Sequence, residues 1–94
     1  MKFKYFLNEA VKTTVQPKNK VELKKIIEET IKEQGFNCDL NFIDTSLIKD
    51  MSYLFYNTEF NGDISQWDVS NVKDMKAMFY DSPLEGNEPN WYKG

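Results

Sequence analysis

The chain has 94 residues, a net charge of −3 and 40% apolar residues, which fits one small globular domain rather than a disordered segment. It has one cysteine and no histidine, so an internal disulfide, a cysteine-based zinc site and histidine chemistry are excluded. Eight Lys and five Glu give residues 1–35 a charge of +3, whereas four Lys and ten Asp or Glu give residues 36–94 a charge of −6. The acidic part lacks the clustered basic side chains of a nucleic-acid surface, so we expect no nucleic-acid partner.

The first residues, MKFKYFLNEAVKTTV, predict an edge strand and no membrane segment. Phe3, Tyr5 and Leu7 alternate with their neighbours as the residues of a strand do. The longest apolar run covers residues 5–7, whereas a signal peptide needs roughly 7–15 apolar residues and a membrane span roughly 20. Unless a leader has been removed, we therefore expect a cytoplasmic chain that does not enter a membrane.

The segment NKVELKKIIEETIKEQG predicts a helix that covers the N-terminal end of the fold. Asn19 is a candidate N-cap, with Glu22 three residues later as in a capping box. Gly35 is a suitable residue just beyond the C-terminus of the helix. The apolar stripe of this helix consists of Leu23, Ile26, Ile27 and Ile31.

A repeat of 24 residues follows the predicted helix. FNCDLNFIDTSLIKDMSYLFY, from Phe36 to Tyr56, aligns without a gap on FNGDISQWDVSNVKDMKAMFY, from Phe60 to Tyr80, with ten identities in 21 positions. A truncated third copy matches at Leu84, Gly86 and Trp91. Repeats of 20–29 residues are typical of leucine-rich repeats, in which neighbouring units cover each other's apolar faces.

Each unit is expected to contain a short strand and a short helix. Alternating apolar residues predict the strand, with the inner face formed by Leu40, Ile43 and Thr45 in one unit and by Ile64, Trp67 and Val69 in the next. Helical spacing of Val72, Met75, Met78 and Phe79 predicts the helix, with Ser70 or Asn71 as its N-cap. The closing EGNEPNWYKG places polar residues where the third strand would lie, which predicts a polar C-terminal edge.

The predicted fold is therefore α/β, a short leucine-rich-repeat solenoid of 24-residue repeats with an N-terminal helical cap. Residues 1–35 form the N-terminal strand and cap helix, and residues 36–94 form the repeats, divided as 36–59, 60–83 and a partial 84–94. The two parts are expected to fold as one unit.

The repeats resemble the BspA-like leucine-rich repeat, in which units of the form FNxDIsxWDVSNVxxMxxMF recur. The likeness covers residues 36–94 and includes the closing SPLEGNEPNWY, which resembles the natural end of such arrays. It implies a protein-binding repeat, often on a bacterial cell surface and in adhesion. Family members tied to adhesion are long arrays with export signals, features that this sequence lacks.

Several residues have both a functional and a structural interpretation. The set that recurs at the repeat period is predicted to form the core: Met51, Met75, Met78, Phe55, Phe79 and Trp67. Cys38 aligns with glycines and has no histidine partner, so we expect a structural thiol. The paired aspartates could form turns, bind calcium or act as an acid/base pair. They are Asp39, Asp63, Asp44, Asp68, Asp50 and Asp74.

The outward positions of the predicted strands are the candidate partner-binding residues: Phe42, Asp44, Gln66 and Asp68. An exposed aromatic beside carboxylates is typical of a binding anchor, although Phe42 could instead lie under the cap helix. We expect a non-enzymatic module that binds another protein through its acidic sheet face. The alternative is a small intracellular acidic inhibitor, of phage or mobile-element type, that blocks a basic nucleic-acid-handling protein. No catalytic residue, cofactor or metal is expected, and self-association stays open.

Overall fold

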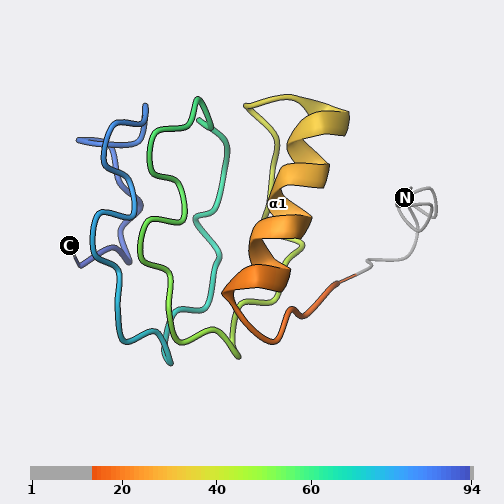
Figure 1. Cartoon of the computed structure of the whole chain (residues 1–94), viewed down its shortest axis with the longest axis vertical. Helices are drawn as coiled ribbons and strands as arrows, with labels where there is room; N and C mark the ends of the chain where they lie inside the picture. Colours follow the sequence, from red (N-terminus) through yellow and green to blue (C-terminus); the bar gives the residue numbers. More distant parts are fainter. Residues whose placement is uncertain (1–13, 94) are drawn as a thin grey trace.

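The computed structural model describes residues 14–93, in which one α-helix lies beside a stack of turning chain segments (Figure 1). The helix, α1, spans Lys20–Gln34. The repeat units 36–59 and 60–83 follow it, and the start of the third unit lies at the far end of the stack from α1. The predicted edge strand around Phe3–Leu7 lies outside the described residues.

The predicted helix is confirmed, and local capping explains where it begins and ends. Asn19 has an extended backbone, and its Oδ1 accepts the N–H of Glu22 at 3.0 Å. The Glu22 carboxylate in turn accepts the N–H of Lys18, just before the N-cap, at 2.8 Å. One free N–H group of the first turn is thus satisfied, and the chain that enters the helix is held in place. Gly35 has φ of 93° and donates its N–H to Ile31 at 2.7 Å, which ends the helix in a conformation that glycine adopts without strain.

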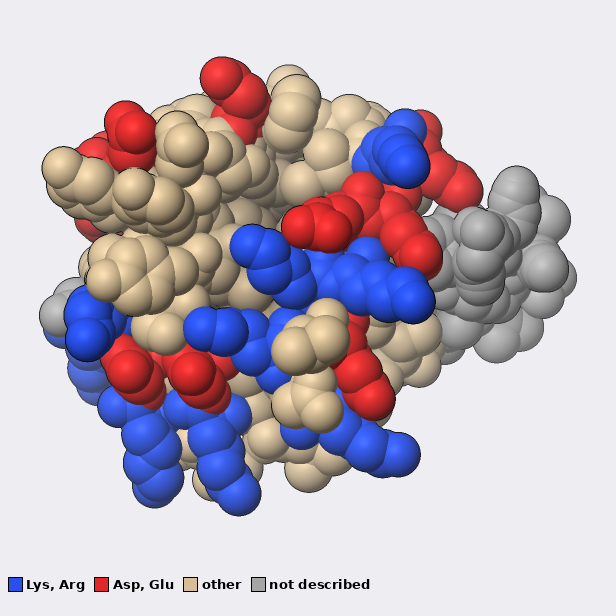
Figure 2. Space-filling model, in the orientation of Figure 1, with Lys and Arg blue, Asp and Glu red and all other residues tan. Residues whose placement is uncertain are grey.

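α1 packs its apolar side on the first repeat unit. Leu23 and Ile27 are buried in the common core. Lys20 anchors the N-terminal end of α1 to this unit, because its Nζ donates to the Ser52 carbonyl at 2.9 Å and lies 3.5 Å from the Asp50 carboxylate. Figure 2 shows Lys and Asp or Glu side chains interspersed over α1, so its outer side is a mixed-charge solvated surface.

Consecutive units stack in the register that the repeat predicts. Leu40 donates its N–H to the carbonyl of Asp63 at 3.0 Å, and Met51 donates to Asp74 at 2.8 Å. The Trp67 indole N–H reaches back to the Leu40 carbonyl at 2.9 Å. Each unit therefore satisfies polar groups of the unit before it as well as covering its apolar side chains.

The expectation of an α/β leucine-rich-repeat solenoid with a sheet is wrong. Within residues 14–93 there is no strand, and the units meet at isolated parallel bridges instead. The reason is the frequency of turns: Ile43 donates its N–H to Leu40 at 3.1 Å and Ile48 donates to Thr45 at 3.0 Å. No stretch stays extended long enough to form a ladder. The bridges are Val15–Ile43, Asp39–Asp63 and Asp50–Asp74.

The short helix predicted for each unit is also wrong. Tyr53 and Ala77, which are equivalent in the repeat, have φ of 59° and 51°. Asn57 and Asp81, a second equivalent pair, have φ of 52° and 63°. A right-handed helix cannot include such residues. The apolar spacing instead belongs to a series of turns, which repeats from one unit to the next.

The predicted core is largely confirmed despite the absence of strands from the described part of the chain. The inward residues of both units are buried, except that Val69, Val72 and Met75 are half-buried. Phe55 lies at the centre, stacked on Phe60 with ring centroids 4.7 Å apart and on Phe79 at 5.8 Å. Repetition of apolar residues at one period therefore identified the buried side of each unit without identifying its backbone conformation.

The backbones of the two units approach closely at Gly62. A Cβ added there would overlap the Cys38 carbonyl oxygen and the Phe60 ring. The Cys38 carbonyl accepts the N–H of Asp63 at 3.2 Å, so this approach belongs to the hydrogen bonding between units. Gly62 is thus a packing requirement of the stack.

Candidate functional site

The six repeated aspartates each close a local turn. In every case Oδ1 accepts the backbone N–H of the residue two positions later, at 2.8–3.0 Å. Three of them also accept a serine hydroxyl, at 2.6–2.7 Å, from Ser52, Ser65 and Ser70. The turn-forming interpretation is confirmed. Among residues 14–93, no three His, Cys, Asp or Glu side chains gather as a metal site would require.

In four of these aspartates the hydrogen bonds lower the pKa and so favour the charged form: Asp44, Asp50, Asp63 and Asp68. The Ser70 hydroxyl and backbone N–H lower the pKa of Asp68 below its ordinary value. The Ser46 hydroxyl and backbone N–H do the same for the pKa of Asp44. Because a charge-assisted hydrogen bond favours the ionised acceptor, both groups are anionic at neutral pH and stay so in mild acid.

The structure brings the predicted residues Asp44 and Asp68 together. The Thr45 hydroxyl, beside Asp44, donates to the Asp68 carbonyl at 2.9 Å, and the negative charge of Asp68 opposes ionisation of Asp44. Gln16 donates its side-chain N–H to Oδ2 of Asp44 at 3.0 Å. Asp44 therefore has both oxygens engaged, whereas Asp68 is exposed and, within residues 14–93, accepts hydrogen bonds only through Oδ1.

Phe42 and Gln66, the other two predicted residues, differ in their surroundings. Phe42 is half-buried against the core, and its carbonyl accepts the N–H of Val15 at 3.3 Å. Gln66 is exposed, and its backbone N–H donates to Oδ1 of Asn41 at 2.9 Å. Phe42 thus presents only part of its ring to solvent. We call the surface formed by Phe42, Asp44, Gln66 and Asp68 the acidic face, and Gln66 and Asp68 are its exposed residues.

Cys38, the sole thiol, is buried. Burial raises the pKa of the thiol, because the thiolate is poorly solvated there. Its interpretation as a structural residue agrees with this position in the core.

Three exposed tyrosines were missed by the sequence reasoning. Tyr56 and Tyr80 stack with ring centroids 5.9 Å apart, and Tyr53 meets Tyr56 edge-on at 5.5 Å. All three are roughly half exposed. The signal was present in the repeat, because Tyr56 and Tyr80 are identical residues that follow the buried Phe55 and Phe79. Exposed, mutually packed tyrosines offer a binding surface of low conformational entropy.

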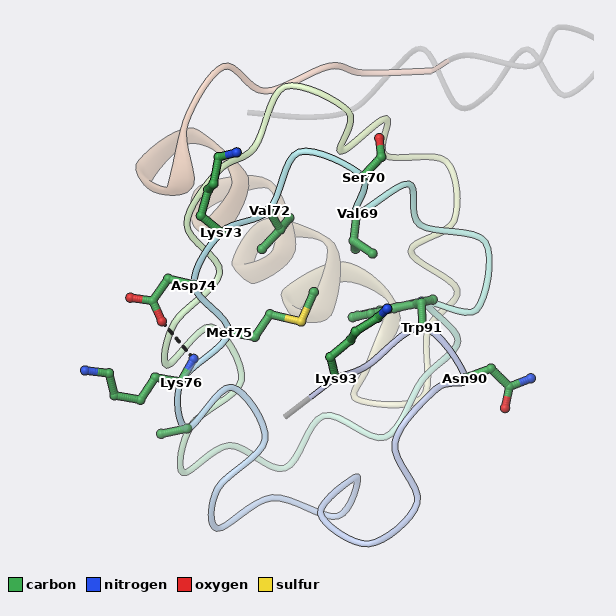
Figure 3. A pocket seen from close by; sticks show the side chains of 11 residues that line it. Val69, Ser70, Val72, Lys73, Asp74, Met75, Lys76, Asn90, Trp91 and Lys93 are labelled. Atoms are coloured by element: carbon green, nitrogen blue, oxygen red, sulfur yellow. Dashed lines mark hydrogen bonds between the residues drawn. The ribbon is translucent and has the colours of Figure 1, made fainter.

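A hollow at the end of the stack away from α1 was also missed. It has a volume of about 830 Å³, and Figure 3 shows Val69, Val72 and Met75 directed into it with Trp91 across one side. The expectation of a polar C-terminal edge is wrong for the centre of this end, which is apolar. The hollow was visible in the sequence only indirectly, as a third unit that keeps few of the repeat's apolar residues.

These observations define a small repeat protein in which stacked units made of turns pack against one helix. A family model described as "Mycoplasma protein of unknown function, DUF285" matches residues 4–91. The chain belongs to this DUF285 family, which is related to the BspA-like repeat proteins. No curated protein and no solved structure matches the chain. Among the described residues, no helix combines the length and the apolar composition that crossing a membrane requires.

Proposed function

We propose that this DUF285 protein is a non-enzymatic protein-binding module of the BspA-like repeat type, and that its acidic face contacts a basic partner. The observation that carries the proposal is the fixed orientation of the carboxylates on neighbouring units. Asp44 and Asp68 occupy equivalent positions of units 36–59 and 60–83, and the turns that they close hold each Oδ1 in place. A charged group that is already ordered loses little entropy when a partner binds.

The resemblance of the repeats to BspA-like units supports the same class of function, because such units serve protein binding. The partner is expected to carry clustered Lys or Arg, since electrostatic complementarity steers association and suppresses wrong partners. The inhibitor of a basic nucleic-acid-handling protein is one form of this proposal, because the same carboxylates would then stand where phosphates bind.

The test is an affinity capture with the wild-type chain and an Asp44→Asn/Asp68→Asn double variant. Asparagine keeps Oδ1 as the acceptor of each turn and removes the charge, so the turns are retained. At position 44 it also replaces the Oδ2 acceptor of the Gln16 side chain, a contact between exposed groups. A partner held by the wild type, released by moderate salt and lost by the variant supports the proposal. Competition by nucleic acid for that partner would identify the inhibitor form.

A matched control uses the second candidate surface. The Tyr56→Ser/Tyr80→Ser variant leaves the aspartates intact and removes the exposed aromatic pair. If the Asp variant captures the same partner as the wild type and the Tyr variant does not, the acidic face is not the binding site.

A further inference from the structure

The two ends of the repeat stack are covered unequally. Unit 36–59 lies between α1 and the next unit, and Thr45, Ile48 and Met51 are 1%, 0% and 0% exposed. The equivalent side chains of unit 60–83 line the hollow of Figure 3 and are half-buried. They are Val69, Val72 and Met75. The side chains equivalent to those that pack one unit against the next are therefore left partly exposed at this end, which we call the open end.

Backbone groups are available there in the same register. In unit 36–59, Met51 and Tyr53 donate their N–H groups to the next unit at 2.8 and 3.0 Å, and the Lys49 carbonyl accepts a hydrogen bond from it at 2.7 Å. The equivalent groups have no hydrogen-bond partner among residues 14–93. They are the N–H groups of Met75 and Ala77 and the carbonyl of Lys73. An extended chain laid along this edge could pair with all of them.

The charge at the rim decides what kind of chain fits. Lys73, Lys76 and Lys93 line the hollow together with one carboxylate, that of Asp74, whose Oδ1 already accepts the N–H of Lys76 at 3.0 Å. In Figure 3 the side chains of Lys73 and Lys76 point outward, and Lys93 lies beside Trp91. The open end is thus basic on an otherwise acidic repeat region. A second copy placed end to end would bring two lysine rims together, which like-charge repulsion disfavours.

We propose that the open end binds an extended acidic peptide of a partner protein. Apolar side chains of the peptide enter the hollow, its backbone pairs with Met75 and Ala77, and its carboxylates contact Lys73 and Lys76. This surface and its acidic ligand are separate from the acidic face and its basic partner, so the two proposals stand or fall independently.

The probe is a labelled peptide based on the segment that covers the same positions within the molecule. Residues 70–81, SNVKDMKAMFYD, lie against unit 36–59. The acidic probe carries Lys73→Glu and Lys76→Glu in this peptide, and the unchanged peptide is the control of equal apolar content. Binding to the full chain is measured by fluorescence anisotropy at low and high salt.

The wild-type chain is expected to bind the acidic probe at least about tenfold more tightly than the unchanged peptide, with the difference shrinking in high salt. In the protein, Lys73→Glu/Lys76→Glu should reverse this preference. A Lys24→Glu/Lys25→Glu protein, which carries the same charge change on exposed positions of α1, should keep it.

Three results would overturn the proposal. They are no binding of the acidic probe, equal binding of both peptides, and the same preference in the charge-reversed protein as in the wild type. Sedimentation of the wild-type chain adds a fourth: a dimer that Met75→Glu dissolves would assign the open end to a second copy of the chain.

Discussion

Met51 and Met75 occupy the same position in successive units. Replacing each of them by alanine, in two separate variants, therefore tests the stacking. Met51 is fully buried because the next unit covers it, whereas Met75 is half-buried at the open end. Met51→Ala should therefore destabilise the chain far more than Met75→Ala, although the repeat alignment does not distinguish the two residues.

The expected magnitudes follow from burial. Replacing a fully buried methionine by alanine costs about 2–5 kcal/mol, because the lost transfer free energy adds to the cost of a cavity. Met75 is only half-buried, so its replacement by alanine loses about half of the transfer free energy and leaves no closed cavity. A fall of about 1 kcal/mol in the free energy of unfolding is therefore expected. A domain of this length has roughly 5–14 kcal/mol of stability in total, so the first substitution removes a large share.

Urea denaturation followed by tryptophan fluorescence measures the difference, since Trp67 and Trp91 both lie in the stack. With an m-value of about 2 kcal/mol/M, the midpoint should fall by about 1–2.5 M for Met51→Ala and by about 0.5 M for Met75→Ala. Equal shifts, or a larger shift for Met75→Ala, would refute the view that the second unit covers the first while its own outer side is open.

Two further predictions concern the contacts between units and the aspartate turns. Gly62→Ala should lower the free energy of unfolding by about 1–3 kcal/mol, because the added Cβ overlaps the Cys38 carbonyl and the Phe60 ring; an unchanged midpoint in urea would contradict this close approach. The pKa values of Asp44, Asp63 and Asp68 lie below the ordinary 3.8 in the folded chain. A lowered folded-state pKa contributes stability that is fully present above the unfolded-state pKa and is lost as pH falls through the folded-state value. Urea midpoints measured between about pH 7 and pH 2 should therefore hold steady to about pH 5 and fall below about pH 4, and Ser70→Ala should reduce that fall by removing the hydroxyl that stabilises ionised Asp68.

The acidic face and the open end suggest a division of roles across this small protein. The acidic face gathers fixed carboxylates at the turns of neighbouring units, while the open end combines apolar side chains with a basic rim. Because the two surfaces carry opposite charges, the partner surfaces proposed for them differ in charge. Neutralising the aspartates and reversing the rim lysines are therefore expected to affect different binding events.

The sequence by itself determined the helix, the repeat and the buried side of each unit. The caps of α1 involve residues within a few positions of each other, so Asn19 and Gly35 could be identified without tertiary information. The 24-residue period identified which residues pack together, because stacked units must place equivalent side chains in equivalent surroundings. The turn-forming role of the aspartates was also accessible, since each turn closes over two residues.

Only the tertiary structure decided the backbone conformation of the units and the character of the surfaces. Apolar spacing at Val72 and Met75 suits a helix and a series of turns equally well. The carbonyls on either side of Ala77, which has a positive φ, accept N–H groups of the neighbouring unit, and local propensity does not contain these contacts. The same holds for Met51 and Met75, whose repeat positions are identical. Whether such a residue is core or binding surface depends on whether another unit lies over it, because burial is a property of neighbours in space and not of position in the repeat.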